Sequence, residues 1–66
     1  MAVLKVIEIM ADSSKSWEEA TKNAVAHASK SVNDIKSVFL QSQSAVVKDG
    51  GITDFRVNVK ITFEVH

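Results

Sequence analysis

The sequence offers few side chains of the types that perform covalent or acid–base chemistry. It contains no cysteine, which excludes a thiol nucleophile, a thiolate metal site and a disulfide. Its two histidines, His27 and His66, are far apart, and neither has a serine or carboxylate at a meaningful spacing. Seven of the eight carboxylates are scattered over predicted loops, helix caps and an outward strand face: Asp12, Glu18, Glu19, Asp34, Asp49, Asp54 and Glu64. We therefore expect no enzyme active site and no metal site.

Charge and hydropathy narrow the classes of partner. Eight basic and eight acidic side chains balance, and no basic stripe with interleaved aromatic residues indicates nucleic-acid binding. No apolar run approaches the roughly 20 residues that cross a membrane. The pair Gly50-Gly51 lacks the flanking residues of a phosphate-binding loop. The first residues lack the pattern of a secretory signal, so we expect a cytoplasmic protein with neither nucleic-acid nor membrane partners.

The length of 66 residues predicts a single domain over residues 1–66. A domain of this size buries only about 60% of its unfolded surface and is marginally stable. Small domains are usually stabilised by disulfides, by a metal or by association. Because cysteine is absent and the histidines are isolated, we expect this domain to be stabilised by association with other chains.

The segment from Ile52 to His66 carries the clearest pattern. From Phe55 onward, apolar and polar residues alternate without a break, which predicts a half-buried strand. At about 3.3 Å per residue this strand spans roughly 40 Å or more. A compact chain of this length has a radius of gyration of only about 11 Å. The strand is thus too long for its own chain to cover.

The residues before this strand predict a strand, a loop and a helix. Residues Ala2–Met10 indicate a first strand with both faces largely covered, followed by a polar loop over Ala11–Ser16. Ser16 and Glu19 form a predicted capping box at the helix start. The helical stripe is mostly alanine and comprises Trp17, Ala20, Ala24, Ala28, Val32 and Ile35. We expect about 16 helical residues ending within residues 31–34, with Trp17 packed at the helix start rather than stacked on a ligand, and with His27 exposed.

Residues Lys36–Val47 predict a second strand whose middle, residues 41–44, is polar throughout. Such a strand is either an edge strand facing water, or it lines a polar cavity or a subunit contact. A tight turn at residues 48–51 joins it to the third strand. These elements predict an α+β fold of type β-α-β-β, with a three-stranded antiparallel sheet in the order 1-3-2 and one helix on one face. The helix is too short to cover the hairpin, and exposed apolar strand surface of this kind marks an interface.

The chain resembles the dodecin family over nearly its whole length. The resemblance rests on Val3–Ile9, on SSKSWEEA at Ser13–Ala20, and on NAVAHASKSV at Asn23–Val32. It continues through NDIK at Asn33–Lys36 and the segment Asp49–Val65. The family fold is the one predicted above, with the sheet wrapping the helix. The resemblance further implies a homo-oligomer of 12 subunits that encloses a hollow sphere.

The family resemblance also implies flavin binding, with riboflavin or FMN held as stored cargo rather than as a redox cofactor. In relatives, paired flavin rings stack between tryptophans of neighbouring subunits, and here Ser37 occupies the matching position. Phe39, two residues later, offers a substitute surface or is simply a packed strand residue. Arg56 matches a polar side chain that bonds the ring edge, although it could equally pair with an acid on a neighbour. Gln43 matches a glutamine that bonds either ligand or subunit backbone.

Two hypotheses follow from the resemblance. In the first, the chain forms a dodecin-like storage shell that binds a flavin or another planar heteroaromatic weakly. In the second, the shell has lost flavin binding because Ser37 has no aromatic face, and it holds another small ligand or an ion, or is purely structural. Some relatives without the tryptophan do not bind flavin, and one such group is associated with calcium. The hydroxyls and amides of the second strand do not indicate a strong calcium site.

Overall fold

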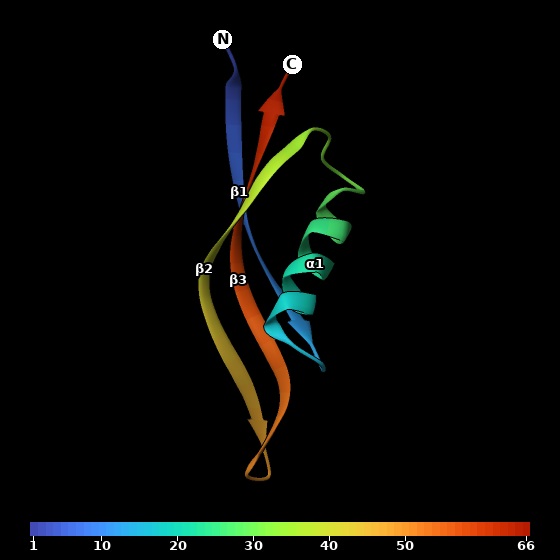
Figure 1. Ribbon diagram of the computed structural model, residues 1–66, viewed down its shortest axis with the longest axis vertical. Helices are drawn as coiled ribbons and strands as arrows, with labels where there is room; N and C mark the ends of the chain where they lie inside the picture. The colour runs from blue at the N-terminus through green and yellow to red at the C-terminus, as the bar shows by residue number, and fades with distance from the viewer.

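The computed structural model describes all 66 residues as one helix packed on a three-stranded sheet (Figure 1). The elements follow in the order β1 (Val3–Ser13), α1 (Trp17–Ala28), β2 (Ile35–Lys48) and β3 (Gly51–Val65). The sheet order is β1-β3-β2, and β3 pairs antiparallel with both neighbours. The α+β prediction is therefore confirmed. β2 is an edge strand, which agrees with one of the two interpretations of its polar residues 41–44.

The molecule is elongated because the β2–β3 hairpin extends far beyond α1. Its dimensions are 50 × 19 × 14 Å, and its radius of gyration is 13.4 Å. A compact chain of this length would have a radius of about 11 Å. In Figure 1 the hairpin tip lies at one end of the molecule and both termini lie at the other. The helix covers only the middle of the sheet, so both ends of β3 lack cover from their own chain.

The core consists of six buried residues at the contact between α1 and β3. The helix contributes alanines with exposed fractions of 0% at Ala20, 2% at Ala24 and 6% at Ala28. Val57, Val59 and Ile61 of β3 are fully buried beneath them. Small alanine side chains let the helix backbone approach the sheet closely, and each buries little apolar area. The helix and the sheet are thus closely packed where they meet, but the buried core contains only six residues.

The start of α1 departs from the predicted capping box in one of its two bonds. The Ser16 hydroxyl accepts from the Glu19 backbone N–H at 3.0 Å, as predicted. The reciprocal bond from Glu19 to the Ser16 N–H is absent, because the Ser13 Oγ accepts from that N–H at 3.4 Å. Ser13 donates in turn to the Glu19 carboxylate at 3.2 Å. Ser13 therefore replaces half of the capping box, and it is the one polar residue that is buried.

The end of α1 was predicted wrongly. The helix ends at Ala28 after 12 residues, so Val32 and Ile35 lie outside it. Beyond Ala28 the chain forms turns, in which the Ser31 and Val32 backbone N–H groups both bond to the Ala28 carbonyl. Serine and asparagine compete with helical hydrogen bonds through their own side chains, and Ser29, Ser31 and Asn33 all follow Ala28. The helix also lacks the length and apolarity of a membrane-spanning segment.

β1 differs from its prediction in length and in cover. It continues through Asp12 to Ser13, which pair with Arg56 and Phe55 of β3. Only the face toward α1 is partly covered. The exposed fractions on the other face are 54% at Leu4, 52% at Val6 and 62% at Met10. The prediction that both faces of β1 are largely covered is therefore wrong for the single chain, which leaves one face exposed.

The turn between β2 and β3 has the predicted geometry. The φ angles of Asp49 and Gly50 are 53° and 80°, and Lys48 pairs with Gly51 across the turn. Positive φ at both central residues is the requirement of a type I′ hairpin. Aspartate and glycine tolerate this region better than other residues. The turn thus fixes the register of the long hairpin.

Candidate functional site

The sheet has one face against α1 and an opposite face that its own chain leaves uncovered, which we call the open face. Because Val57, Val59 and Ile61 are buried against α1, the residues that alternate with them point to the open face. Residues directly opposite in register share that face. The open face therefore comprises Arg56, Asn58, Lys60, Thr62 and Glu64 of β3, Leu4, Val6, Glu8, Met10 and Asp12 of β1, and Ser37, Phe39, Ser42 and Ser44 of β2.

Ser37 and Phe39 lie side by side on the open face near one end of the sheet. Ser37 pairs with Thr62 and Phe39 with Lys60. The Phe39 side chain is 62% exposed, and the only aromatic pair in the structure lies elsewhere, between Trp17 and Phe55. An exposed aromatic ring on a rigid strand offers a surface on which a planar ligand can stack. The two residues are thus placed together as the sequence predicted.

Gln43 does not share this face, because β2 contains a bulge. The register shifts between Leu40 and Ser42, which leaves Gln41 as the extra residue. From Ser37 up to this bulge the odd-numbered residues of β2 face away from α1, and from Ser42 to Val46 the even-numbered ones do. Gln43 therefore pairs with the buried Val57 and points toward α1. Simple alternation over residues 36–47 missed this change, and the polar run at its centre was the available signal.

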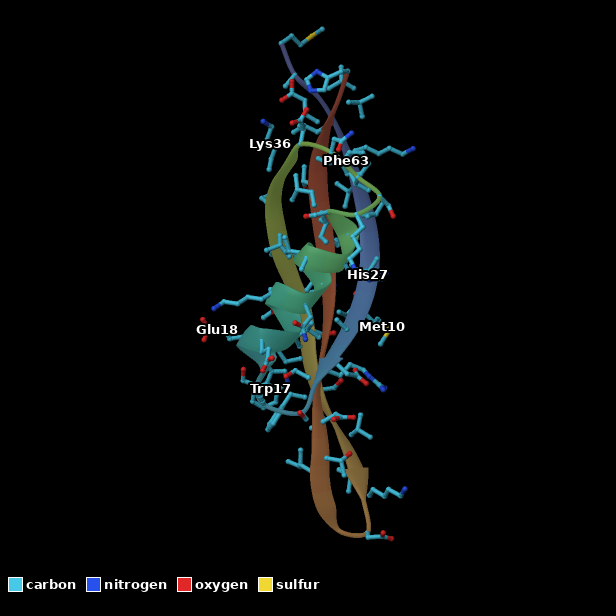
Figure 2. The ribbon with its side chains drawn as sticks, turned by 90° about the vertical axis from the view of Figure 1, so that its right-hand side faces the viewer. Met10, Trp17, Glu18, His27, Lys36 and Phe63 are labelled. Carbon is cyan, nitrogen blue, oxygen red and sulfur yellow. The ribbon has the colours of Figure 1, made fainter.

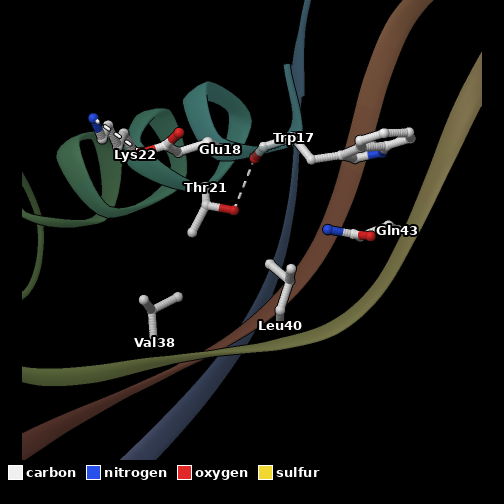
Figure 3. A pocket seen from close by; sticks show the side chains of 7 residues that line it. All are labelled: Trp17, Glu18, Thr21, Lys22, Val38, Leu40 and Gln43. Carbon is white, nitrogen blue, oxygen red and sulfur yellow. Dashed lines mark hydrogen bonds and ion pairs between the residues drawn. The ribbon is translucent and has the colours of Figure 1, made fainter.

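Gln43 lines an open groove of about 460 Å³ between the start of α1 and β2. Figure 3 shows Gln43 beside the Trp17 ring, with Val38 and Leu40 on the floor and Thr21 on the helix. Trp17 packs edge-on against Phe55, with ring centroids 4.8 Å apart. Figure 2 shows Trp17 at the level where the hairpin leaves the helix. The predicted packing role of Trp17 at the helix start is confirmed.

Arg56 makes a two-pronged ion pair with Asp12, its register partner on β1. The guanidinium Nε donates to Asp12 Oδ1 at 2.7 Å, and Nη2 donates to Oδ2 at 3.1 Å. These bonds lower the pKa of Asp12 and raise the pKa of Arg56. The charge of Asp54 raises the pKa of Arg56 slightly further. The pair uses two of the five guanidinium N–H groups, so both N–H groups of Nη1 and the second N–H of Nη2 are available to another acceptor.

Ser37 and Arg56 are too far apart in one chain to contact the same small ligand. Ser37 lies opposite Thr62, while Arg56 is six positions away along β3. At about 3.3 Å per residue this separation is roughly 20 Å. A shared site would thus need Ser37 and Phe39 from one copy and Arg56 from another. Three of the four predicted site residues, Ser37, Phe39 and Arg56, lie on one face, but they form no closed pocket within the chain.

The open face also carries a polar atom without a partner. The side-chain oxygen of Asn58 is buried between neighbouring strands and accepts no hydrogen bond. Asn58 lies between Met10 and Ser42 in register. No group of three or more histidine, aspartate or glutamate side chains is close enough to hold a metal ion. The face is therefore suited to apolar and hydrogen-bonding contacts.

Comparisons with known proteins agree with this architecture. Residues 3–66 match the family model described as Dodecin. A protein named calcium dodecin from Mycobacterium tuberculosis is 35% identical over 65 residues, which cover 98% of this chain and 92% of the relative. A crystal structure of calcium dodecin from that organism, a calcium-chelating antigen with a novel calcium-binding site, superposes with a TM-score of 0.85. It is 35% identical, and the match covers 97% of this chain and 91% of that one.

Two more distant structures share the fold. The dodecin of Streptomyces coelicolor matches with a TM-score of 0.94 at 22% identity, covering 98% of this chain and 93% of that one. A mutant dodecin from T. thermophilus matches with a TM-score of 0.93 at 20% identity, covering 100% and 98%. At these identities the likeness establishes the fold alone.

Proposed function

Because this chain belongs to the dodecin family, we propose that it forms a hollow homododecamer that binds and stores a small planar heteroaromatic of the flavin class. It is a single dodecin-like domain over residues 1–66 and a cytoplasmic binding protein rather than an enzyme. Its partners are copies of itself and the small ligand, with neither nucleic acid nor a membrane involved. Riboflavin and FMN are the candidate flavins.

Assembly is supported by the apolar surface that the chain leaves exposed. Leu4, Val6 and Met10 are each more than half exposed on the open face. Val47 and Ile52 near the hairpin tip are 65% and 60% exposed. With only six core residues, a lone copy leaves much of its apolar area in water, and contacts between copies would bury it. Assembly thus supplies the stability that the small core does not.

Ligand binding is supported by one observation above all, the exposed Phe39 ring beside Ser37 on the open face. Two Phe39 rings from neighbouring copies would stack on a flavin in place of the absent tryptophans. Phenylalanine presents a smaller π surface than tryptophan, so the binding is weak. Arg56 of another copy would donate to a ring carbonyl through Nη1. Gln43, which lies on the helix side, would bond to the backbone of a neighbouring subunit rather than to the flavin.

Titration of the native particle with riboflavin, followed by flavin fluorescence, tests this function. We expect quenching that saturates and a native mass near twelve times that of one chain. Phe39→Ala should abolish quenching without changing the native mass, and Val38→Ala is the matched control on the other face of β2. Unquenched fluorescence at high protein excess would show that the protein does not bind flavin. A folded particle with the mass of one chain would contradict the proposed dodecameric shell.

A second candidate is a shell that does not bind flavin and holds another small ligand or an ion. Ser37 favours it, because a hydroxyl cannot stack on a ring. The 35% identical relative is named for calcium, but the described residues contain no acidic cluster that could hold an ion within one chain. Calorimetric titration with CaCl₂ distinguishes the candidates. Saturable heat with calcium and none with riboflavin would favour the second.

A further inference from the structure

The helix-side face of β2 is uncovered along much of the strand. α1 packs mainly against β1 and β3 and makes little contact with β2. Val38 and Leu40 lie opposite buried residues of β3, so their side chains point to the helix side, yet they are 37% and 38% exposed. They belong to the apolar floor of the groove of about 460 Å³ between α1 and β2. This groove therefore lacks cover from its own chain.

The end of the β2–β3 hairpin also lacks cover. β1 ends at Ser13, so residues 51–54 of β3 pair with β2 alone. This end of the hairpin, residues 47–52, is a two-stranded ribbon that we call the hairpin tip, and such a ribbon is marginally stable by itself. Val47 and Ile52 are register partners on it, so they share one face, and their exposed fractions are 65% and 60%. The tip thus presents a pair of apolar side chains to water.

The tip and the groove of one chain cannot meet. The Trp17 indole bonds to the carbonyl of Ser44, which lies between Leu40 and Val47 along β2. The separation of Leu40 and Val47 along the strand is roughly 20 Å at about 3.3 Å per residue. Because the paired strand holds them apart, only another molecule can bring a tip into this groove.

The charges of the two surfaces are complementary. Glu18 and Lys22 line the groove, and Lys48 and Asp49 lie at the tip. Each surface carries one cation and one anion, so the two surfaces do not repel one another. The Glu18 side chain is 81% exposed, which leaves its carboxylate accessible to a lysine of another copy. A second copy of this chain therefore supplies a partner of suitable charge.

The backbone of the tip has hydrogen-bonding groups that the groove can satisfy. The edge of residues 51–54 on the β1 side has N–H and C=O groups without a strand partner. Gln43 lines the groove, and its amide can both donate and accept. Leu40 and the Trp17 ring supply apolar surface beside it. The groove thus combines apolar contact with a group that can bond to an extended backbone.

Resting on the proposed assembly, we infer that the hairpin tip of one copy docks in the α1–β2 groove of the next copy. Val47 and Ile52 cover Leu40, and the Gln43 amide bonds to the backbone of the docked tip. Because the tip and the groove are different surfaces, the contact is head-to-tail, and such contacts close into rings when the rotation between copies permits. The tip docks on the helix side, so the open face with Phe39 stays accessible.

Disulfide trapping tests this contact directly, because the chain has no cysteine of its own. The variant Leu40→Cys/Ile52→Cys places one thiol in the groove and one at the tip. A disulfide requires Cα atoms within about 7 Å, so the two thiols of one chain are too far apart to bond. After oxidation with diamide, we expect non-reducing electrophoresis to show loss of most of the monomer band into covalent species of three or more chains. Covalent dimers alone would indicate a reciprocal contact and would overturn head-to-tail docking.

The controls separate this contact from random collisions and from the proposed function. Leu40→Cys/Val3→Cys is the matched control, because Val3 is also exposed, at 56%, but lies near the termini at the opposite end of the molecule. It should stay monomeric on the gel, and equal cross-linking of this control would overturn the contact. Thr21→Cys/Val47→Cys probes the helix wall of the groove and allows for a shift of the docked tip.

The native mass of each variant, measured before oxidation, distinguishes the remaining outcomes. An assembled particle in which neither tip–groove pair forms covalent multimers would overturn this contact and leave the proposed function standing. A wild-type particle with the mass of one chain would overturn the proposed shell and this contact together.

Discussion

The indole Nε1 of Trp17 donates a hydrogen bond of 2.8 Å to the backbone carbonyl of Ser44, 27 positions away in the sequence. This bond joins the first residue of α1 to β2 beyond its bulge. The same ring packs edge-on against Phe55 of β3. Trp17 thus contacts both strands of the hairpin where they emerge from beneath the helix. These two contacts of Trp17 hold the long hairpin in a fixed orientation relative to α1.

Replacing Trp17 with phenylalanine should therefore destabilise the fold moderately. Trp17→Phe keeps an aromatic contact with Phe55 but removes the donor to Ser44. The expected loss in the free energy of unfolding is about 1 to 2 kcal/mol, the range for one hydrogen bond plus some packing. Urea unfolding at one fixed subunit concentration measures it, since assembly makes stability concentration-dependent. His27→Gln on the exposed helix face should change stability by less than about 0.5 kcal/mol. Equal stability of Trp17→Phe and wild type would contradict this role.

Ser13 should be far more sensitive than its neighbour Ser14. Ser13 is 7% exposed, and its hydroxyl oxygen accepts from the Lys15 and Ser16 backbone N–H groups at 3.0 and 3.4 Å. Ser13→Ala leaves these donors and the Glu19 carboxylate without their partner, at an expected cost of about 1 to 3 kcal/mol. Ser14→Ala, at an exposed position, is the control and should be nearly neutral. Similar unfolding midpoints for the two variants would refute the bridging role of Ser13.

Ala24 should not tolerate a larger side chain. It is 2% exposed and belongs to the same buried cluster as Val59, so no space remains for a longer side chain. Ala24→Leu should lower the free energy of unfolding by about 1 to 3 kcal/mol through overpacking. Ala26→Leu introduces the same side chain on the exposed side of the same helix and should stay within about 0.5 kcal/mol. Thermal unfolding of both variants decides the matter. A stable Ala24→Leu protein would show that the helix can move away from the sheet.

The Asp12–Arg56 pair should make stability depend on pH in a defined direction. The pKa of Asp12 is lowered from its ordinary value of 3.8, mainly by the Arg56 hydrogen bond. The unfolded chain therefore binds this proton more readily than the folded one. The stabilisation is present above the ordinary value and is lost as pH falls through the lowered pKa. Because the pair is exposed, the effect is small.

Unfolding midpoints of wild type, Asp12→Asn and the Asp49→Asn charge control, measured between about pH 7 and pH 2, test this direction. The difference between wild type and Asp12→Asn should be constant near neutral pH and shrink toward zero in acid. Asp49→Asn corrects for the general effect of removing one negative charge. A difference that grows on acidification would show that the sign is wrong.

The parts of the fold that follow from local pattern were predictable. Alternation from Phe55 to Val65 identified β3, and the sequence Asp49-Gly50 identified the turn. Together with one intervening helix they determined the strand order. The helix end was missed because Val32 continues the apolar stripe, although the turns after Ala28 depend on hydrogen bonds that spacing does not reveal. Periodicity reports which residues are apolar, not where the backbone stops being helical.

The candidate site was predictable only in part, for two physical reasons. A bulge at Gln41 reverses which side chains share a face, so Gln43 lies away from Ser37 and Phe39. A bulge adds one residue without a distinctive composition, and a polar run was the only sign of it. The pairing of Arg56 with Asp12 depends on strand register. The sequence pattern assigned Asp12 to a loop, whereas in the structure it belongs to β1 and lies directly opposite Arg56. Neither feature is encoded in a local motif.

Restoring an aromatic platform at Ser37 separates a missing ring from a wider change of the site. Ser37 lies on the open face opposite Thr62, beside Phe39. Ser37→Trp should raise riboflavin affinity by up to about tenfold, since an aromatic stack contributes roughly 0.5 to 1.5 kcal/mol beyond the area it buries. Ser42→Trp places the same ring farther along this face, beyond the bulge, and should gain much less. Fluorescence quenching of riboflavin measures both variants. If Ser37→Trp folds, keeps the native mass of wild type and still gains no affinity, the site differs from a tryptophan stacking site in more than one residue.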